Sequence, residues 1–516
     1  MKRSGQGTGI FKATAIMTAF SLAAKLLGVL LRLYLSSRVG SEGMGLYQLV
    51  MSVYGLFGAL STAGLTVAVS RLAAEKAVRS LSDASRVLGA AEGIALGIGA
   101  VSAAVLWLSA PLLSFRFLRD ERCVLPLRIL ALSLPCMALA ACFKGWFIAK
   151  KQVLRSSSAS LFEQCVKFAV MAWFLGVKLG GTNDVGALCK GIVWGVTLGE
   201  FCSFVYLLLA YRFLAGRVRR ADFMPTETRS EAAGQVARVV LPIGASVAVT
   251  SVLHTVESLL IPIAFERFGG DRANALSEFG VIRGMVLPLL FFPFAILSSF
   301  VSVTIPEISR LHSPETHTLR AERIGETLRT TFLLAIPAGA LFFFLAPELG
   351  ETFYPHQNTA HALRVLASVT PLMYVQTVCD GLLKATDGQK YTLRYGLYNS
   401  LFRVSAVLLL LPRSGAEGYL ALLVASNTLE FALCFRRLRK NTGFLLSARH
   451  DLLFPLVSSV LGGIASRIAA ASLPRVLPAF ASPLLCAVTG TAVFCAVYIL
   501  MLCPTFNTCR AASSRS

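Results

Sequence analysis

The chain has 516 residues, of which 55% are hydrophobic and 15% charged, and its mean hydropathy is +0.68. These values exclude an ordinary soluble domain, in which about a quarter of the residues are charged. The formal net charge of +22 does not indicate nucleic acid as a partner, because the basic residues lie in loops between apolar stretches, as they do in membrane proteins.

Apolar stretches of about 20 residues, the length that crosses a bilayer as a helix, recur along the whole chain. Barrel strands are excluded, since they have about 10 residues and alternate in polarity. The sequence therefore predicts an all-α, polytopic membrane protein of about fourteen transmembrane helices. The predicted spans are 11–33, 44–67, 86–112, 125–148, 158–178, 186–211, 237–264, 279–303, 328–346, 361–384, 393–412, 417–435, 452–471 and 482–503.

The basic N-terminus resembles the start of a secretory signal. Lys25 interrupts its apolar run, however, and a second span follows directly, so we expect an uncleaved first helix. The predicted loops alternate in charge: 31 Lys and Arg residues fall on the side of the N-terminus, 14 on the other side and four within spans. Because positive loops stay inside, both termini are predicted to lie in the cytoplasm.

Three short patterns recur in the same order in the two halves of the chain. They are Ser70-Arg71-Leu72 with Ser309-Arg310-Leu311, Thr197-Leu-Gly-Glu-Phe201 with Thr428-Leu-Glu-Phe431, and Gly145 plus Gln152 with Gly381 plus Gln389. Their separations, 239, about 230 and about 236 residues, each cover six predicted helices, so both copies have the same orientation. We expect Arg71 and Arg310, which end corresponding helices, to have structural or gating roles.

This pattern predicts two parallel six-helix repeats, a transporter architecture in which the substrate is held between the halves. The expected divisions are an N-terminal lobe over 1–220, a basic cytoplasmic linker over 221–236 and a C-terminal lobe over 237–445. Residues 446–516 would add two further helices and a short tail.

Ionisable residues within membrane spans are costly, at about 2.5–3.5 kcal/mol even by the lower estimates, and therefore suggest function. Lys25 lies in the middle of the first span and Arg283 five residues into the eighth. Facing each other across a central crevice, they would bind a phosphate or carboxylate. Arg32 is a third candidate for this cavity, although it is near enough to the outer surface to extend its side chain there.

Acidic residues within the spans have structural alternatives. Glu163 and Lys167 have the i,i+4 spacing of a helical ion pair, which favours a structural or gating role. Glu200 and Glu430, which correspond in the repeat, are expected near the cytoplasmic ends of their helices, where cations of the next loop could pair with them. His254 and Glu257 share one helix face and could bind a coupling proton or cation; alternatively, they make only structural contacts, with Glu257 pairing with Arg283.

No catalytic motif is visible, so we expect a transporter rather than an enzyme. The sequence contains neither a nucleotide-binding GxxxxGK[ST] loop nor an HExxH motif. Its 12 cysteines occur singly and mostly within apolar segments, which indicates no metal site. No cofactor is predicted, and transport would draw on an ion gradient, the membrane potential or the substrate gradient.

The stretch from Ser21 to Glu75, SLAAKLLGVLLRLYLSSRVGSEGMGLYQLV followed by GLTVAVSRLAAE, resembles the N-terminal signature of stage V sporulation protein B-like transporters. These belong to the multidrug/oligosaccharidyl-lipid/polysaccharide (MOP) exporter superfamily. The blocks Phe143-Lys-Gly-Trp-Phe147 to Ser160-Leu-Phe-Glu-Gln164, and Arg283 with Pro306-Glu-Ile-Ser-Arg310, also resemble that family. The resemblance extends to the related lipid II flippases, although lysine replaces arginine at positions 25 and 167.

The resemblance implies a flippase that moves lipid-linked oligosaccharide or peptidoglycan precursors across the bacterial cytoplasmic membrane by alternating access. Lys25, Arg32 and Arg283 would hold the pyrophosphate of an undecaprenyl-type lipid. The other expected partners are membrane lipids and cell-wall or sporulation assembly proteins. One alternative is a cation-coupled multidrug exporter of the same superfamily, which should favour acidic cavity residues such as Glu257. Another is a membrane scaffold or a polymerase of lipid-linked glycans, against which the lack of a large outer loop argues.

Overall fold

A computed structural model describes residues 4–78, 80–178, 181, 184–218, 228–311, 314–355, 357–476 and 482–513. Throughout these ranges every regular element is a helix, which confirms the predicted all-α class. Residues 221–227 of the expected linker lie outside the described residues. The lobe boundaries at 220, 236 and 445 remain a prediction.

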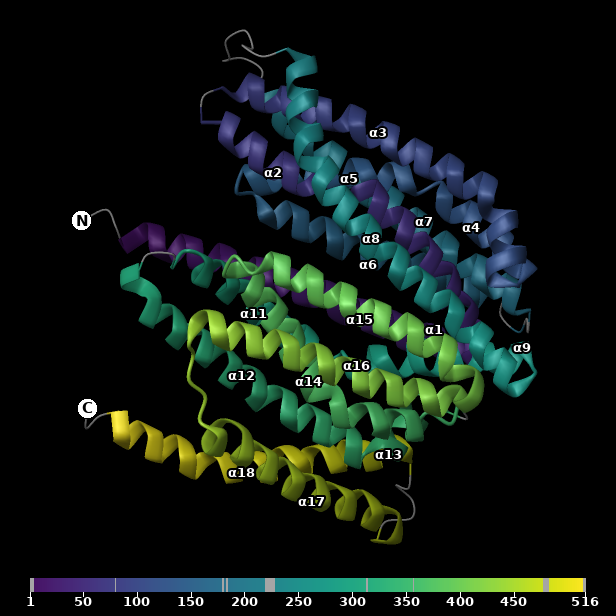
Figure 1. Cartoon of the computed structure of the whole chain (residues 1–516), viewed down its shortest axis with the longest axis vertical. Helices are drawn as coiled ribbons and strands as arrows, with labels where there is room; N and C mark the ends of the chain where they lie inside the picture. Colours follow the sequence, from purple (N-terminus) through teal and green to yellow (C-terminus); the bar gives the residue numbers. More distant parts are fainter. Residues whose placement is uncertain are drawn as a thin grey trace. The chain divides into compact units, whose positions relative to one another are not determined.

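The helices form two compact units, which we describe separately (Figure 1). Unit 1 comprises residues 1–31 and 46–260, and unit 2 comprises residues 32–45 and 261–516. The helices of unit 1 are α1 (Ser4–Thr62, outside its residues 32–45), α2 (Leu65–Lys76), α3 (Leu81–Leu112), α4 (Val124–Ala131), α5 (Leu134–Ala149), α6 (Val153–Trp173), α7 (Val185–Val218) and most of α8 (Arg229–Gly269).

Unit 2 receives the middle of α1 and the end of α8. Its own helices are α9 (Arg272–Phe279), α10 (Leu287–Leu290), α11 (Phe294–Ser309), α12 (His317–Phe344), α13 (Ala346–Phe353), α14 (Ala360–Ala385), α15 (Gln389–Leu409), α16 (Leu411–Thr442), α17 (Phe454–Val476) and α18 (Pro483–Ser513). A π-helical segment, η4 (Gly280–Val286), joins α9 to α10, and another, η6 (Ala448–Leu453), precedes α17.

Eleven helices among the described residues are long and apolar enough to cross a membrane, or twelve if the bent pair α4 and α5 forms one span. The predicted count of fourteen is therefore not confirmed, and two places account for the difference. The first two predicted spans are two helices that meet at a non-helical residue, Gly40, and together carry the one label α1. The eleventh corresponds to α15, whose polar first turns, with Lys390 and Arg394, keep it outside that group of apolar helices.

Small residues bring the helices of unit 1 close together. At Gly145 in α5, a Cβ atom would lie 2.8 Å from the carbonyl oxygen of Thr66 in α2. At Gly99 in α3, it would lie 2.8 Å from Cα of Pro135 in α5. Association between helices in lipid depends on such close packing, since lipid tails are as apolar as the side chains and water provides little driving force.

Larger side chains fill the interior of unit 2. Tyr374 of α14 is 1% exposed and packs against Phe291 and Phe294, with ring centroids 5.9 and 5.1 Å away. The C-terminal helices α17 and α18 lie side by side (Figure 1). They are attached to the rest of unit 2 by an Arg467–Glu348 ion pair and by the Tyr498 hydroxyl, which donates to the Leu333 carbonyl at 2.9 Å.

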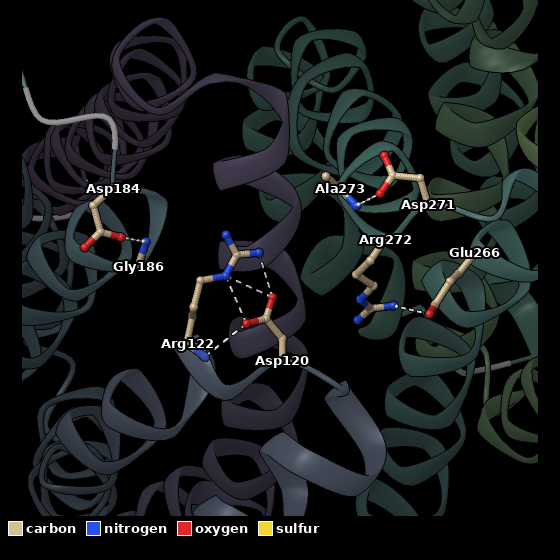
Figure 2. A network of polar contacts seen from close by, with 8 residues as sticks. All are labelled: Asp120, Arg122, Asp184, Gly186, Glu266, Asp271, Arg272 and Ala273. Atoms are coloured by element: carbon tan, nitrogen blue, oxygen red, sulfur yellow. Dashed lines mark hydrogen bonds and ion pairs between the residues drawn. The ribbon is translucent and has the colours of Figure 1, made fainter.

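Carboxylates order several turns between helices, as Figure 2 shows. In unit 1, Asp120 accepts hydrogen bonds from Nε and Nη2 of Arg122, at 3.0 and 2.8 Å, and Asp184 accepts from a backbone N–H at 2.8 Å. In unit 2, Asp271 caps the N-terminus of α9. The contacts of Asp184 and Asp271 satisfy backbone N–H groups that have no partner within the helix they begin.

Candidate functional site

Arg283 lies in the π-helical segment η4 of unit 2. Its Nε donates a hydrogen bond of 2.7 Å to the hydroxyl of Tyr419 in α16. Tyr419 is fully buried, and its ring packs edge-on against Phe265 with centroids 5.9 Å apart. Since π-helical turns occur frequently at functional sites, a buried hydroxyl that orients this guanidinium supports Arg283 as a site residue.

Arg32 belongs to the segment of α1 that packs in unit 2, the unit that also contains Arg283. Its side chain is exposed, and its charge acts on Tyr354. Burial raises the pKa of the Tyr354 hydroxyl, and the positive charge of Arg32 partly offsets that rise. This hydroxyl donates to the carbonyl of Met285 at 2.9 Å, two residues after Arg283. Tyr354 is therefore bound to the segment that contains Arg283 and also feels the charge of Arg32.

Lys25 belongs to unit 1 and is exposed. One turn further along α1, a Cβ atom on Gly28 would lie 3.8 Å from the side-chain oxygen of Gln164 in α6. This part of α1 therefore runs beside the Glu-Gln pair of α6 that the sequence singled out. Because Lys25 and Arg283 lie in different units, their predicted opposition stays a prediction.

A compact charge cluster joins α6 to α7. Lys167 Nζ lies 2.6 Å from Glu163 Oε1 and 2.9 Å from Glu200 Oε1, and these three side chains are only 10 to 12% exposed. Lys144 Nζ lies 3.7 Å from the other oxygen of Glu163. Gly199 lets the two helices approach here, since a Cβ atom at that position would be 3.0 Å from Lys167 Cε.

The expected ion pair between Glu163 and Lys167 is thus present, but the expectation for Glu200 was wrong. Glu200 lies in the middle of α7, which extends from Val185 to Val218. It therefore binds the buried Lys167 rather than a cation of the following loop.

Glu430 in α16 is also held inside its unit rather than by a loop. Its carboxylate accepts hydrogen bonds from Gln376 Nε2 at 3.0 Å and from Asn399 Nδ2 at 2.6 Å. Arg403, one turn after Asn399 on α15, acts on it electrostatically. The expectation of a loop partner was wrong here too, because α16 continues to Thr442, twelve residues beyond Glu430.

The remaining candidates are His254 and Glu257 in α8, Arg71 in α2 and Arg310 after α11. His254 Nδ1 is 4.0 Å from Glu257 Oε2; the histidine side chain is 64% exposed and the glutamate 1%. Arg71 in α2 and Arg310 after α11 are both exposed. The neighbouring serines Ser70 and Ser309 donate to backbone carbonyls three and four residues earlier. In the described ranges, no group of three His, Cys, Asp or Glu side chains could hold a metal ion.

Residues 10–312 match the family described as polysaccharide biosynthesis protein. This match covers more than half of the chain. The chain belongs to the polysaccharide biosynthesis protein family.

Two relatives of this polysaccharide biosynthesis protein come from Bacillus subtilis (strain 168). Stage V sporulation protein B is 22% identical over 404 residues, which cover 78% of this chain and 78% of the relative. Lipid II flippase MurJ is 21% identical over 488 residues, which cover 89% of this chain and 88% of the relative.

Solved structures show the same fold. A lipid II flippase MurJ in an inward closed conformation aligns with a TM-score of 0.67 at 12% identity, covering 96% of this chain and 99% of that one. An inward-facing multidrug resistance MATE family transporter of the MOP superfamily aligns with a TM-score of 0.62 at 16% identity, covering 83% and 94%. The predicted resemblance to stage V sporulation protein B-like transporters and to lipid II flippases is confirmed.

Several residues that bind the charged side chains of this family member could not be recognised from the sequence. Tyr419, which orients Arg283, is one of 12 tyrosines. Gln376 and Asn399, which bind Glu430, are uncharged. A search for polar residues at the repeat separation of about 236 could have found Asn399 and Arg403, which follow Glu163 and Lys167 by that interval.

Proposed function

We propose that this polysaccharide biosynthesis family protein is a flippase that moves a lipid-linked oligosaccharide or peptidoglycan precursor across the bacterial cytoplasmic membrane. Its similarity along most of its length to stage V sporulation protein B and to a lipid II flippase supports this class. The observation that carries the site is Arg283, held by a buried tyrosine hydroxyl within an apolar helical unit.

The proposed substrate has a pyrophosphate head group and an undecaprenyl-type lipid. A guanidinium keeps its charge even where water is scarce and presents its N–H donors as a rigid fork that matches phosphate oxygens. The bond to Tyr419 uses Nε and fixes the plane of that fork. In this proposal Arg283 orients the head group, while Lys25 and Arg32 add positive charge along its path.

The proposed protein works by alternating access, with both termini in the cytoplasm and no bond of the substrate changed. A gradient or the membrane potential would supply the energy. Cell-wall or sporulation assembly proteins would receive the product on the outer side. A polymerase would instead change the glycan chain length, which a reconstituted reaction with lipid-linked precursor would reveal.

Leaflet accessibility of a labelled lipid-linked precursor tests the site. Replacing Arg283 or Lys25 with Ala should reduce appearance in the outer leaflet at least about tenfold, since one charge-assisted hydrogen bond contributes about 1.5–3 kcal/mol. Tyr419→Phe should give a smaller loss, because only the orienting hydroxyl is removed.

The matched control is Arg323→Ala, which removes an exposed arginine that pairs with Glu326 at 3.0 Å in α12. Its transport should equal that of the wild type. Full transport by both Arg283→Ala and Lys25→Ala, at wild-type membrane abundance, would refute the assignment of these two residues.

A second candidate is a cation-coupled multidrug exporter, which one observation favours. The Glu257 carboxylate is 1% exposed and lies near His254, so it could bind a coupling proton or cation. Drug resistance in cells that overproduce the protein, lost on Glu257→Gln and retained on Arg283→Ala, would favour the exporter over the flippase.

A further inference from the structure

The π-helical segment η4, which contains Arg283, is bound by a second tyrosine besides Tyr419. The hydroxyl of Tyr354, at the end of α13, donates to the carbonyl of Met285 at 2.9 Å. Tyr354 is 3% exposed. Hydroxyls from two different helices therefore hold this segment, one at the Arg283 side chain and one at the backbone two residues later.

A buried tyrosine usually finds some hydrogen-bond partner, so one such contact alone says little about function. Among the described residues of unit 2, four tyrosines are buried: Tyr354, Tyr374, Tyr419 and Tyr498. The first three bind the short stretch from Arg283 to Leu290, whereas the last binds α12. This convergence indicates that the stretch needs support from outside its own helix.

The geometry of η4 explains that need. Its hydrogen bonds span five residues, as from the Leu287 N–H to the Ile282 carbonyl, a pattern that is rare in proteins. Pro288 has no N–H, so the same turn loses a further helical hydrogen bond. One residue corresponds to about 100° of rotation in an α-helix. Conversion of η4 to an α-helical turn would therefore turn the Arg283 side chain about the helix axis relative to α10.

Tyr354 is itself fixed in place by α13. Its backbone N–H donates to the Gly350 carbonyl at 2.8 Å and closes the last turn of this helix. A Cβ atom on Gly350 would lie 2.8 Å from Thr359 Oγ1, so α13 packs closely against the start of α14. In the first turn of α13, Glu348 forms an ion pair with Arg467 of α17. The tyrosine hydroxyl thus reaches η4 from an anchored helix.

We infer that Tyr354 is a positioning residue for Arg283: its hydroxyl holds η4 in the π-helical form in which Tyr419 orients the guanidinium toward a phosphate. This inference rests on the proposed flippase function, in which Arg283 contacts the pyrophosphate of the substrate. The Tyr354 hydroxyl is buried and bound to the Met285 carbonyl. Its effect on substrate affinity therefore passes through Arg283.

A double-mutant cycle tests this dependence. The affinity of the purified full-length protein for undecaprenyl pyrophosphate is measured in detergent. Tyr354→Phe removes only the hydroxyl and should raise the Kd about three- to tenfold, the factor that corresponds to one hydrogen bond. In an Arg283→Ala background the same substitution should cause no further loss, because residues that act through one another are not additive.

Tyr498→Phe is the matched control. It also removes a buried hydroxyl that donates to a backbone carbonyl at 2.9 Å, that of Leu333, and it should leave the Kd unchanged. An equal loss from Tyr354→Phe with and without Arg283, or no loss at all, would overturn the positioning role. Wild-type affinity in Arg283→Ala would instead contradict the proposed substrate site, on which this inference rests.

Hydrogen exchange gives an independent measurement that needs no substrate. In Tyr354→Phe, the amides of residues 280–287 should exchange severalfold faster than in the wild type, because η4 loses a contact that holds its backbone. Tyr498→Phe should instead affect α12 and α18 and leave η4 unchanged. Unchanged exchange over residues 280–287 in Tyr354→Phe would mean that this hydroxyl does not hold the segment.

Discussion

The two units carry corresponding polar clusters that neutralise their carboxylates in different ways. In unit 1, one ammonium, Lys167, lies between the carboxylates of Glu163 and Glu200. In unit 2, the carboxylate of Glu430 accepts hydrogen bonds from two neutral amides, and Arg403 acts on it only electrostatically. The clusters correspond by repeat separation, with Asn399 following Glu163 by 236 residues, Arg403 following Lys167 by 236 and Glu430 following Glu200 by 230.

The difference shows how the same framework tolerates two charge arrangements. In unit 1, Lys167 contacts both Glu163 and Glu200, while Lys144 lies near Glu163 alone at 3.7 Å, so Lys167 is the critical member of the cluster. In unit 2, Asn399 stands where unit 1 has Glu163. The remaining carboxylate, Glu430, accepts hydrogen bonds from the amides of Gln376 and Asn399. We therefore expect unit 1 to be the more sensitive of the two to a single substitution, and three experiments test this difference.

The largest effect is expected from Lys167→Met. Removing one partner of a buried ion pair leaves uncompensated charge and costs about 3–5 kcal/mol. Thermal unfolding of the purified protein in detergent should show a clearly lower midpoint. The neutral triple variant Glu163→Gln, Lys167→Met, Glu200→Gln is the control and should recover much of the loss. An unchanged midpoint for Lys167→Met alone would contradict the central role of this lysine.

An intermediate effect is expected from Glu430→Gln. The amide keeps the shape of the side chain but has one acceptor oxygen where the carboxylate has two. One hydrogen bond becomes neutral, and at the other position the new NH2 group faces the N–H donor of a neighbouring amide, so the loss is about 1–3 kcal/mol. The same unfolding measurement should place this variant between the wild type and Lys167→Met. If its midpoint fell as far as that of Lys167→Met, the two units would be equally sensitive and the comparison would fail.

The smallest effect is expected from Asn399→Glu, which gives unit 2 the carboxylate that unit 1 has. Arg403 lies four residues later on α15, the favourable order for a helical ion pair, so the change in stability should stay below about 1 kcal/mol. Asn399→Leu is the control: it also loses the amide but cannot form the new pair, and it should be the less stable. The reverse order would show that Arg403 cannot act as Lys167 does.

Local sequence patterns predicted the interactions that form within one helix. Glu163 and Lys167 are four residues apart on α6, and helical geometry alone brings them together. The length of the apolar stretches also predicted an all-α membrane protein. The same reasoning misjudged the partners of Glu200 and Glu430, because a partner on another helix depends on how that helix is packed and rotated.

The junction between the first two spans shows the same limit. Hydropathy places two spans before residue 67, and they are the two parts of α1 on either side of Gly40. Hydropathy averages composition over a window and does not detect one glycine with positive φ. It also does not show that the segment around this break packs with residues of the second half of the chain.

The amino-acid sequence was enough to identify the helical membrane class and the family, and the cations within its predicted spans suggested an anionic substrate. These inferences follow from composition, the length of the apolar stretches and local motifs, which do not depend on the partner of any residue. The folded structure was needed to show that Tyr419 orients Arg283, that Lys167 contacts two carboxylates and that Ser41 and Gly45 meet Gly280 and Leu276. Each is a contact between elements distant in the chain, and close packing rather than sequence spacing brings them together.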